Sequence, residues 1–203
     1  MGRKIAGFAF LFLCMCLVKG TACSAATQVA AGSCGENATW TLDDENVLTI
    51  RGTGRISDRS WEQSRRWKWI EEYPSPYDYN YDIEGDDPHF VTVVIEKWIT
   101  GIGVKSFSSP YIKKVTIPDG VTEIGAWAFE YSSIKSLDIP DSVVEIGGGA
   151  FAHCRQLTGV HLPERLTRIN DHVFCECIAL KDVTIPDSVT EIETTAFDGT
   201  RNL

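Results

Sequence analysis

The feature that most constrains this chain is a motif that recurs every 22 or 23 residues in its second half. A full copy runs from Val115 to Phe129 and reads VTIPDGVTEIGAWAF. Aliphatic anchors recur at this period, at Ile95, Ile117, Ile139, Leu162 and Ile185. A phenylalanine recurs with the same steps, at Phe107, Phe129, Phe151, Phe174 and Phe197. A fixed period of this length is typical of a solenoid in which each repeat forms one coil.

Each repeat is expected to form a strand, a turn and a return leg. Val115 and Ile117 lie two residues apart, so both point inward on a strand. The proline that follows lacks an N–H and therefore suits a strand end. The same pattern predicts inward pairs at Leu137 and Ile139, Val160 and Leu162, and Val183 and Ile185, and inward return-leg residues at Ile124, Ile146, Ile169 and Ile192. One coil buries too little apolar surface to order its own backbone, so coils must stack.

The predicted fold is therefore a β-rich right-handed solenoid of 22–23-residue coils with parallel strands, five of them over residues 91–203. Residues 26–60 are predicted to form a small N-terminal β cap. Residues 38–42 and 47–50 alternate apolar and polar side chains around a polar turn, which indicates a β-hairpin. Its apolar side chains are expected to cover the first coil, as terminal units of a solenoid must do: Trp40, Leu42, Leu48 and Ile50.

Residues 1–25 have the layout of a secretory signal peptide. Arg3 and Lys4 precede an uncharged run from Ile5 to Val18, and small residues follow. That run of 14 residues is shorter than the ~20 that a membrane-spanning helix needs. Cleavage after Ala25 or Ala26 is expected, and lipidation at Cys23 is the alternative.

Residues 61–90 are an irregular segment rich in aromatic and acidic residues. One interpretation is a glycan platform built from exposed rings at Trp67, Trp69, Tyr77 and Tyr79. Clustered carboxylates between Asp78 and Asp87 are compatible with Ca²⁺, although their spacing is not that of an EF-hand loop. The other interpretation is a capping loop whose rings cover the edge of the solenoid.

The net charge of −9 makes nucleic acid an unfavourable partner. Removal of residues 1–25 takes away three bases and no acid, which leaves 16 bases against 28 acids, or −12. Such a surface also has no electrostatic attraction to anionic lipid. Contact with a membrane is therefore expected only through a lipid at Cys23.

The mature chain contains four cysteines, at Cys34, Cys154, Cys175 and Cys177. Cys154 and Cys177 occupy the same repeat position, so they are expected one coil apart. Together with His153 and His172 they are compatible with a metal site, and in an exported protein with a disulfide. The third interpretation, which we favour, is that these thiols fill small gaps in the core. No metal or other cofactor is predicted.

The outward strand positions form the candidate partner-binding surface. They are small and polar: Lys114, Thr116, Ser136, Asp138, His161, Asp182 and Thr184. The acids that follow the prolines, at Asp119, Asp141, Glu164 and Asp187, are expected to be solvated and able to steer a basic partner. No arrangement of a nucleophile, a base and an orienting acid appears, and His161 is interpreted as a surface residue.

The repeats resemble the BspA-type leucine-rich repeat. The match is close from Ile134 to Cys154, in the pattern I-x-x-L-x-I-P-D-x-V-x-x-I-G-x-x-A-F-x-x-C. The segment from Cys34 to Gly54 is similar to the leader that precedes such repeats in exported bacterial proteins. The chain departs from the pattern at Ser132 and Thr200, where cysteine is usual, and at Asn170 and Glu193, where glycine is usual. The resemblance implies a secreted or cell-surface protein, and some members of the family adhere to host proteins or to other microbes.

Two functions are therefore expected. The first is an exported, adhesin-like protein-interaction module without catalytic activity that binds an extracellular protein through the strand face or the acidic turns. The alternative is a carbohydrate-binding module that uses the rings of residues 61–81. A hydrolase that uses acids near residues 82–87 is a weaker idea, since nothing in the sequence fixes their geometry.

Overall fold

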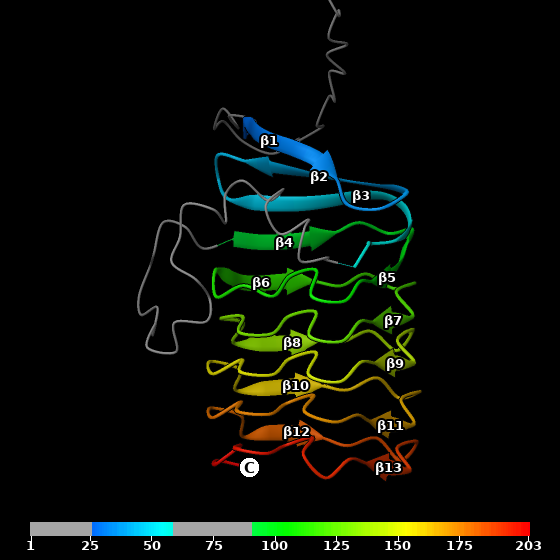
Figure 1. Ribbon diagram of the computed structural model, residues 1–203, viewed down its shortest axis with the longest axis vertical. Helices are drawn as coiled ribbons and strands as arrows, with labels where there is room; N and C mark the ends of the chain where they lie inside the picture. The colour runs from blue at the N-terminus through cyan, green and yellow to red at the C-terminus, as the bar shows by residue number, and fades with distance from the viewer. Residues whose placement is uncertain (1–25, 59–90) are drawn as a thin grey trace, which may run out of the picture.

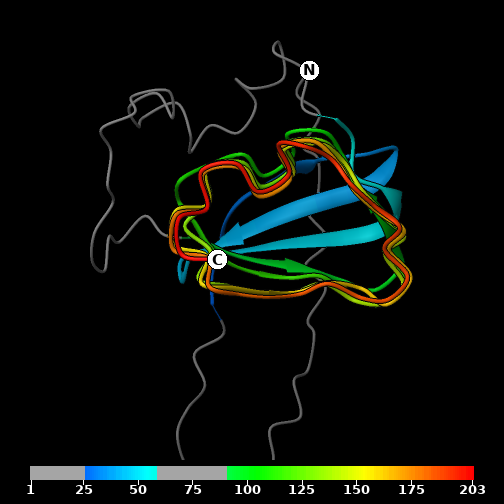
Figure 2. The ribbon, with the colours of Figure 1, turned by 90° about the horizontal axis from the view of Figure 1, so that it is seen from below.

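The computed structural model describes residues 26–58 and 91–203 and shows a stack of coils (Figure 1). Seen along the stack, the coils superimpose on one closed outline (Figure 2). Each coil has a strand on the front leg and a short strand on the return leg: β4 (Val91–Ile95) and β5 (Ile99–Ile102), β6 (Ile112–Thr116) and β7 (Glu123–Ile124), β8 (Ser136–Asp138) and β9 (Glu145–Ile146), β10 (Gly159–His161) and β11 (Arg168–Ile169), β12 (Asp182–Thr184) and β13 (Glu191–Ile192).

Parallel pairing joins successive coils. On the front leg β4 pairs with β6, and β10 pairs with both β8 and β12. On the return leg β7 pairs with β5 and β9, and β11 pairs with β13. The predicted solenoid with parallel strands is confirmed, and the described residues contain no helix. No helix in the described ranges is therefore long and apolar enough to cross a membrane.

The N-terminal cap is a three-stranded antiparallel sheet rather than a hairpin. The predicted hairpin is present as β2 (Asn37–Asp43) and β3 (Val47–Arg55), and β1 (Gln28–Ser33) adds a strand against β2. Strand β3 also pairs in parallel with both β4 and β5. It therefore precedes the first coil in the row of front-leg strands and in the row of return-leg strands. The side chains expected to cover the first coil are buried in the same core cluster as those of the coils: Trp40, Leu42, Leu48 and Ile50.

The phenylalanines form one continuous stack through the core. Their ring centroids are 5.3, 5.6, 5.7 and 5.4 Å apart from Phe107 to Phe197, and successive planes differ by 17° or less. The backbone beside each ring bonds to the next coil, as when the Phe129 N–H donates to the Ala150 carbonyl at 2.8 Å. Backbone groups of the turns that carry the rings thereby find hydrogen-bond partners in the neighbouring coils, as buried N–H and C=O groups must.

Close approach of the coils explains the glycine that follows the return-leg isoleucine in the first three coils. A Cβ at Gly147 would lie 2.5 Å from the backbone nitrogen of Ala126. One coil later Asn170 takes this position, and its side-chain amide donates to the Ile146 carbonyl at 2.6 Å. This departure from the repeat therefore replaces a close contact by a hydrogen bond to the preceding coil.

Two residues predicted to face inward are more exposed than expected. Ile185 is 37% exposed and Ile192 is 48% exposed, whereas their counterparts Ile139 and Ile146 are almost fully buried. The physical reason is that an inward side chain is covered partly by its own coil and partly by the coils on either side. Ile185 and Ile192 belong to the last coil described and have a neighbouring coil on one side.

Candidate functional site

The outward positions of the front leg form an exposed strand face. All seven of the predicted residues are exposed: Lys114, Thr116, Ser136, Asp138, His161, Asp182 and Thr184. Pairing places them in rows that run along the solenoid. Asp138 lies opposite His161, and His161 lies opposite Thr184 in the next coil. Their orientation is as predicted, and their role in binding stays a prediction.

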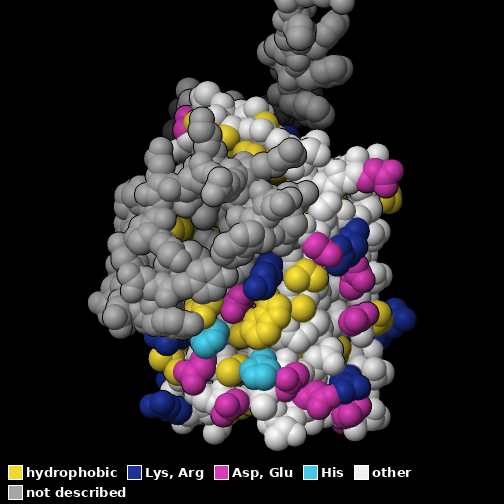
Figure 3. Space-filling model, in the orientation of Figure 1, with side chains coloured by type: hydrophobic (Ala, Val, Ile, Leu, Met, Phe, Trp, Pro, Cys, Tyr) yellow, Lys and Arg dark blue, Asp and Glu magenta, His cyan; other side chains and the backbone are white. Residues whose placement is uncertain are grey.

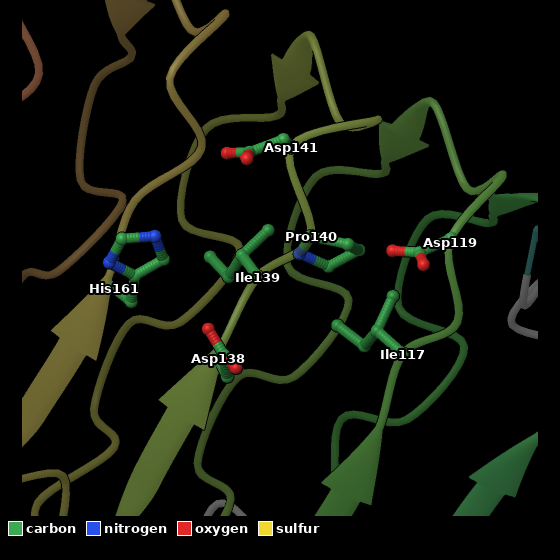
Figure 4. A pocket seen from close by; sticks show the side chains of 7 residues that line it. All are labelled: Ile117, Asp119, Asp138, Ile139, Pro140, Asp141 and His161. Carbon is green, nitrogen blue, oxygen red and sulfur yellow. The ribbon is translucent and has the colours of Figure 1, made fainter.

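A groove crosses this face where the strands end. Its cavity volume is about 340 Å³, and Figure 4 shows its lining. The polar lining consists of Asp119, Asp138, Asp141 and His161. The apolar lining residues are Ile117, Ile139 and Pro140, and the two isoleucines are buried. The groove therefore brings together two predicted strand-face residues, Asp138 and His161, and two acids from the turns.

The turns that build the groove have a shared geometry set by proline. Pro140 follows strand β8, and its carbonyl accepts a hydrogen bond from the Val143 N–H at 3.0 Å. In the next coil the Glu164 N–H donates to Asp141 Oδ1 at 2.9 Å. One carboxylate oxygen of Asp141 is thus tied to the backbone of the next coil, and the side chain stays exposed. This bond fixes the direction of one acid at the rim.

The electrostatic character of the groove is negative. Three carboxylates and one histidine line it, and within residues 26–58 and 91–203 no lysine or arginine does. Adjacent coils place neighbouring strand residues ~5 Å apart, so the charges lie close enough to act on a single bound segment. Pro140, the half-buried apolar residue of the lining, can contact the aliphatic stem of a long basic side chain. The arrangement is suited to binding a cationic chain segment.

The buried thiols are packed as gap-filling residues and bond to the backbone. Cys154 Sγ donates to the Phe129 carbonyl at 3.3 Å, and Cys177 Sγ donates to the Phe151 carbonyl at 3.2 Å. Ser132, at the same repeat position, lies 3.1 Å from Cys154 Sγ through its hydroxyl. The four cysteines of the described residues are free thiols, and no group of three or more potential metal ligands occurs in those residues.

The surroundings of the thiols suppress their ionisation. Hydrogen bonding with Cys154 and burial raise the pKa of Cys177, and burial raises the pKa of Cys34 to about 11. Burial, followed by the nearby charge of Asp198, raises the pKa of Cys175. Because the thiolate is the reactive form, none of these three side chains is arranged as a nucleophile.

A set of stacked rings on the turns was not predicted from the sequence. Tyr131 and His153 stack with centroids 4.7 Å apart, and Trp127 lies 6.2 Å from the ring of His172. Figure 3 shows histidine side chains next to apolar side chains on one face of the lower coils. Burial lowers the pKa of His153, and its Nδ1 is buried without a hydrogen-bond partner. Tyr131, His153 and His172 all have positive φ. Because none of them is a glycine, the sequence did not indicate this conformation.

Several predictions fall outside the described residues. The signal peptide at 1–25, with Cys23, lies there, and so does the irregular segment at 61–90. The candidate glycan platform of Trp67, Trp69, Tyr77 and Tyr79 belongs to that segment. These assignments stay predictions.

A comparison with protein families shows to which family the repeats belong. A family model described as the BspA type leucine rich repeat region, in six copies, matches residues 86–203. This chain belongs to the BspA-type leucine-rich repeat family. A comparison with curated proteins gave no match.

Several solved structures are similar to this BspA-type chain. A leucine rich cell surface protein from Faecalibacterium prausnitzii is 27% identical with a TM-score of 0.51, and the match covers 84% of this chain and 46% of that one. A leucine-rich repeat protein from Bacteroides capillosus is 26% identical with a TM-score of 0.38, over 79% and 86% of the two chains. The pneumococcal vaccine antigen PcpA is 17% identical with a TM-score of 0.49, over 85% and 48%. The chain thus spans less than half the length of the Faecalibacterium protein.

Proposed function

We propose that this chain is an exported or cell-surface protein-interaction module, adhesin-like and non-catalytic, whose groove binds a basic segment of an extracellular protein. The observation that carries the proposal is the groove itself, which Asp119, Asp138 and Asp141 line together. Family membership supports a role in protein interaction, because leucine-rich repeats present extended surfaces to partners. The similar Faecalibacterium protein is a cell surface protein, which supports the proposed location of this chain.

The chemistry of the groove favours binding over catalysis. Thr116, Asp138 and His161 are outward side chains on three different strands. Among the described residues, the groove lining contains no serine, cysteine or lysine to act as a nucleophile. Carboxylates at the rim of an interface mainly speed association and select the charge of the partner. Binding to the groove should therefore weaken steeply as salt is added.

The proposal is tested by titrating the protein with a fluorescein-labelled peptide that alternates lysine and alanine. Asp138→Asn and Asp141→Asn are each expected to weaken binding about two- to fivefold, which is the range that exposed ion pairs support. Glu145→Gln is the matched control, because Glu145 is an exposed acid on strand β9 outside the groove lining. Equal losses in all three variants would show that general charge attracts the peptide, and the groove would then not be the site.

A further inference from the structure

The turn between β4 and β5 carries a tryptophan that packing does not explain. Trp98 is 65% exposed, the highest value among the large hydrophobic side chains in the described ranges. Its φ is 87°, which lies in the left-handed region that bulky side chains avoid. The indole is exposed, so its burial does not offset this backbone strain. An exposed aromatic side chain held in an unfavourable backbone conformation is a reason to look for a function.

The register of the coils places Trp98 in line with the groove. Val94 pairs with Thr116 and Gly101 pairs with Glu123, both at an offset of 22 residues. Trp98 is therefore the counterpart of Gly120, and Lys97 is the counterpart of Asp119. The turns match in detail, since the Ile99 N–H donates to the Glu96 carbonyl as the Val121 N–H does to the Pro118 carbonyl. Trp98 thus lies one coil from Gly120, which follows Asp119 in the chain.

The space beside Trp98 is open on the side of the groove. Gly120 has φ 108°, and no atom of the described residues lies within 4 Å of the position where its Cβ would be. Adjacent coils are ~5 Å apart, so an extended segment of about four residues spans the distance from Trp98 to Asp141. One partner segment can therefore contact the indole and the carboxylates together.

The indole is already placed to hold a cation. The Lys97 ammonium lies 5.0 Å from the centre of the Trp98 ring, within the ~6 Å reach of a cation–π contact. Because the ring is 65% exposed, most of its surface is available to a second group. Arginine suits this position better than lysine, since its planar guanidinium stacks on aromatic rings and also pairs with carboxylates.

We infer that Trp98 is the specificity-determining residue of the groove and selects an arginine from the partner, with the guanidinium stacked on the indole and directed at the carboxylate of Asp119. This inference rests on the proposed function, because it names the side chain that the groove prefers in its basic partner. Among interface residues tryptophan and arginine are the usual centres of binding energy. The remaining acids, Asp138 and Asp141, take further basic residues without choosing between lysine and arginine.

The test compares two labelled peptides of equal length and charge, one alternating arginine with alanine and the other alternating lysine with alanine. The protein is expected to bind the arginine peptide about two- to fivefold more tightly, the range of one exposed cation–π contact. Trp98→Ala should abolish this preference and leave the affinity for the lysine peptide within twofold. Trp98→Gly, which suits the positive φ, should do the same while the protein melts no earlier than the parent.

The outcomes separate the two proposals. If both peptides bind the parent protein equally while Asp138→Asn weakens them, the inference on Trp98 is overturned and the proposed function stands. If neither peptide binds, the proposed function fails, and the inference fails with it. If Trp98→Ala and Trp98→Gly lose structure, as judged by circular dichroism, Trp98 has a structural role and the inference is overturned as well.

Discussion

The rings of Phe129 and Phe151 lie almost parallel, with centroids 5.6 Å apart and planes 3° apart. Both side chains are fully buried, and they belong to successive coils. Each also stacks on a further phenylalanine on its other side. An interior ring therefore contributes to two interfaces between coils, and the stack links every coil from Phe107 to Phe197. Stability in such an array is close to a sum of terms between neighbours.

Replacing Phe151 by alanine should cost about 3 to 5 kcal/mol of unfolding free energy, the usual range for a buried phenylalanine. The matched control is Phe197→Ala, because Phe197 is only partly buried and stacks on Phe174 alone among the other phenylalanines of the described residues. Its cost should be roughly half or less. Urea denaturation of both variants gives the two values. Equal losses would contradict the interior role of Phe151.

Gly149 should not tolerate alanine, whereas its neighbour Gly148 should. A Cβ at Gly149 would lie 2.2 Å from the Trp127 ring, and the φ of Gly149 is 67°. Left-handed backbone costs a non-glycine residue roughly 1–2 kcal/mol, before any clash with the ring. At Gly148 the nearest atom to a Cβ is the Asp171 carbonyl oxygen at 3.1 Å. Thermal melting should therefore rank Gly149→Ala well below Gly148→Ala, and the reverse order would contradict the placement of Trp127.

The protein should lose stability in mild acid because of His153. Burial lowers the pKa of His153 below its ordinary value of 6.5, against an opposing effect of Glu176 and with smaller contributions from Arg155 and His172. The unfolded chain therefore binds the proton first. The contribution to stability is complete above pH ~6.5 and declines as the pH falls toward the folded pKa.

The variant His153→Gln should flatten the change in melting temperature between pH 7.5 and pH 5. The control His161→Gln removes an exposed histidine of the strand face, and it should leave the slope of the parent in place. An unchanged slope in His153→Gln would mean that another group carries the acid sensitivity.

The thiols should be reduced and unequally reactive. In the native protein Cys175, which is half-buried, should react with a thiol reagent before the three buried cysteines, Cys34, Cys154 and Cys177. After denaturation without reductant, a chain that begins at residue 26 should release four thiols. A count of two would indicate that a disulfide forms, and Cys154 and Cys177 would be the pair to examine. Zinc bound to these thiols would instead appear as metal released on denaturation.

The repeat period determined most of the fold in advance. The spacing of the repeats alone predicted the positions of the phenylalanines, the inward isoleucines and the strand ends, because each coil must repeat the packing of its neighbours. Strand β1 was missed, since Gln28–Ser33 has no apolar alternation and pairs through its backbone. The positive φ of Trp127, His153 and Glu176 was also missed. Residues other than glycine adopt this backbone conformation when contacts with the adjacent coils stabilise it.

The candidate site was predicted in part. Alternation on the strands identified Asp138 and His161, and the position after proline identified Asp119 and Asp141. Their convergence on one groove depends on the register between coils, which the sequence implies only through its period. Trp98 was not singled out, since its significance comes from its exposure and its positive φ, and neither is visible without the backbone.

The binding site is mapped by adding the lysine–alanine peptide and following the backbone amide chemical shifts of the protein. We expect the shifts to change at the strand ends and turns of the groove, at Ile117, Asp119, Asp138, Ile139, Asp141 and His161, with a neighbouring change at Trp98. Changes confined to the return-leg strands β7 and β9, or to the turns that carry Tyr131 and His153, would contradict this expectation.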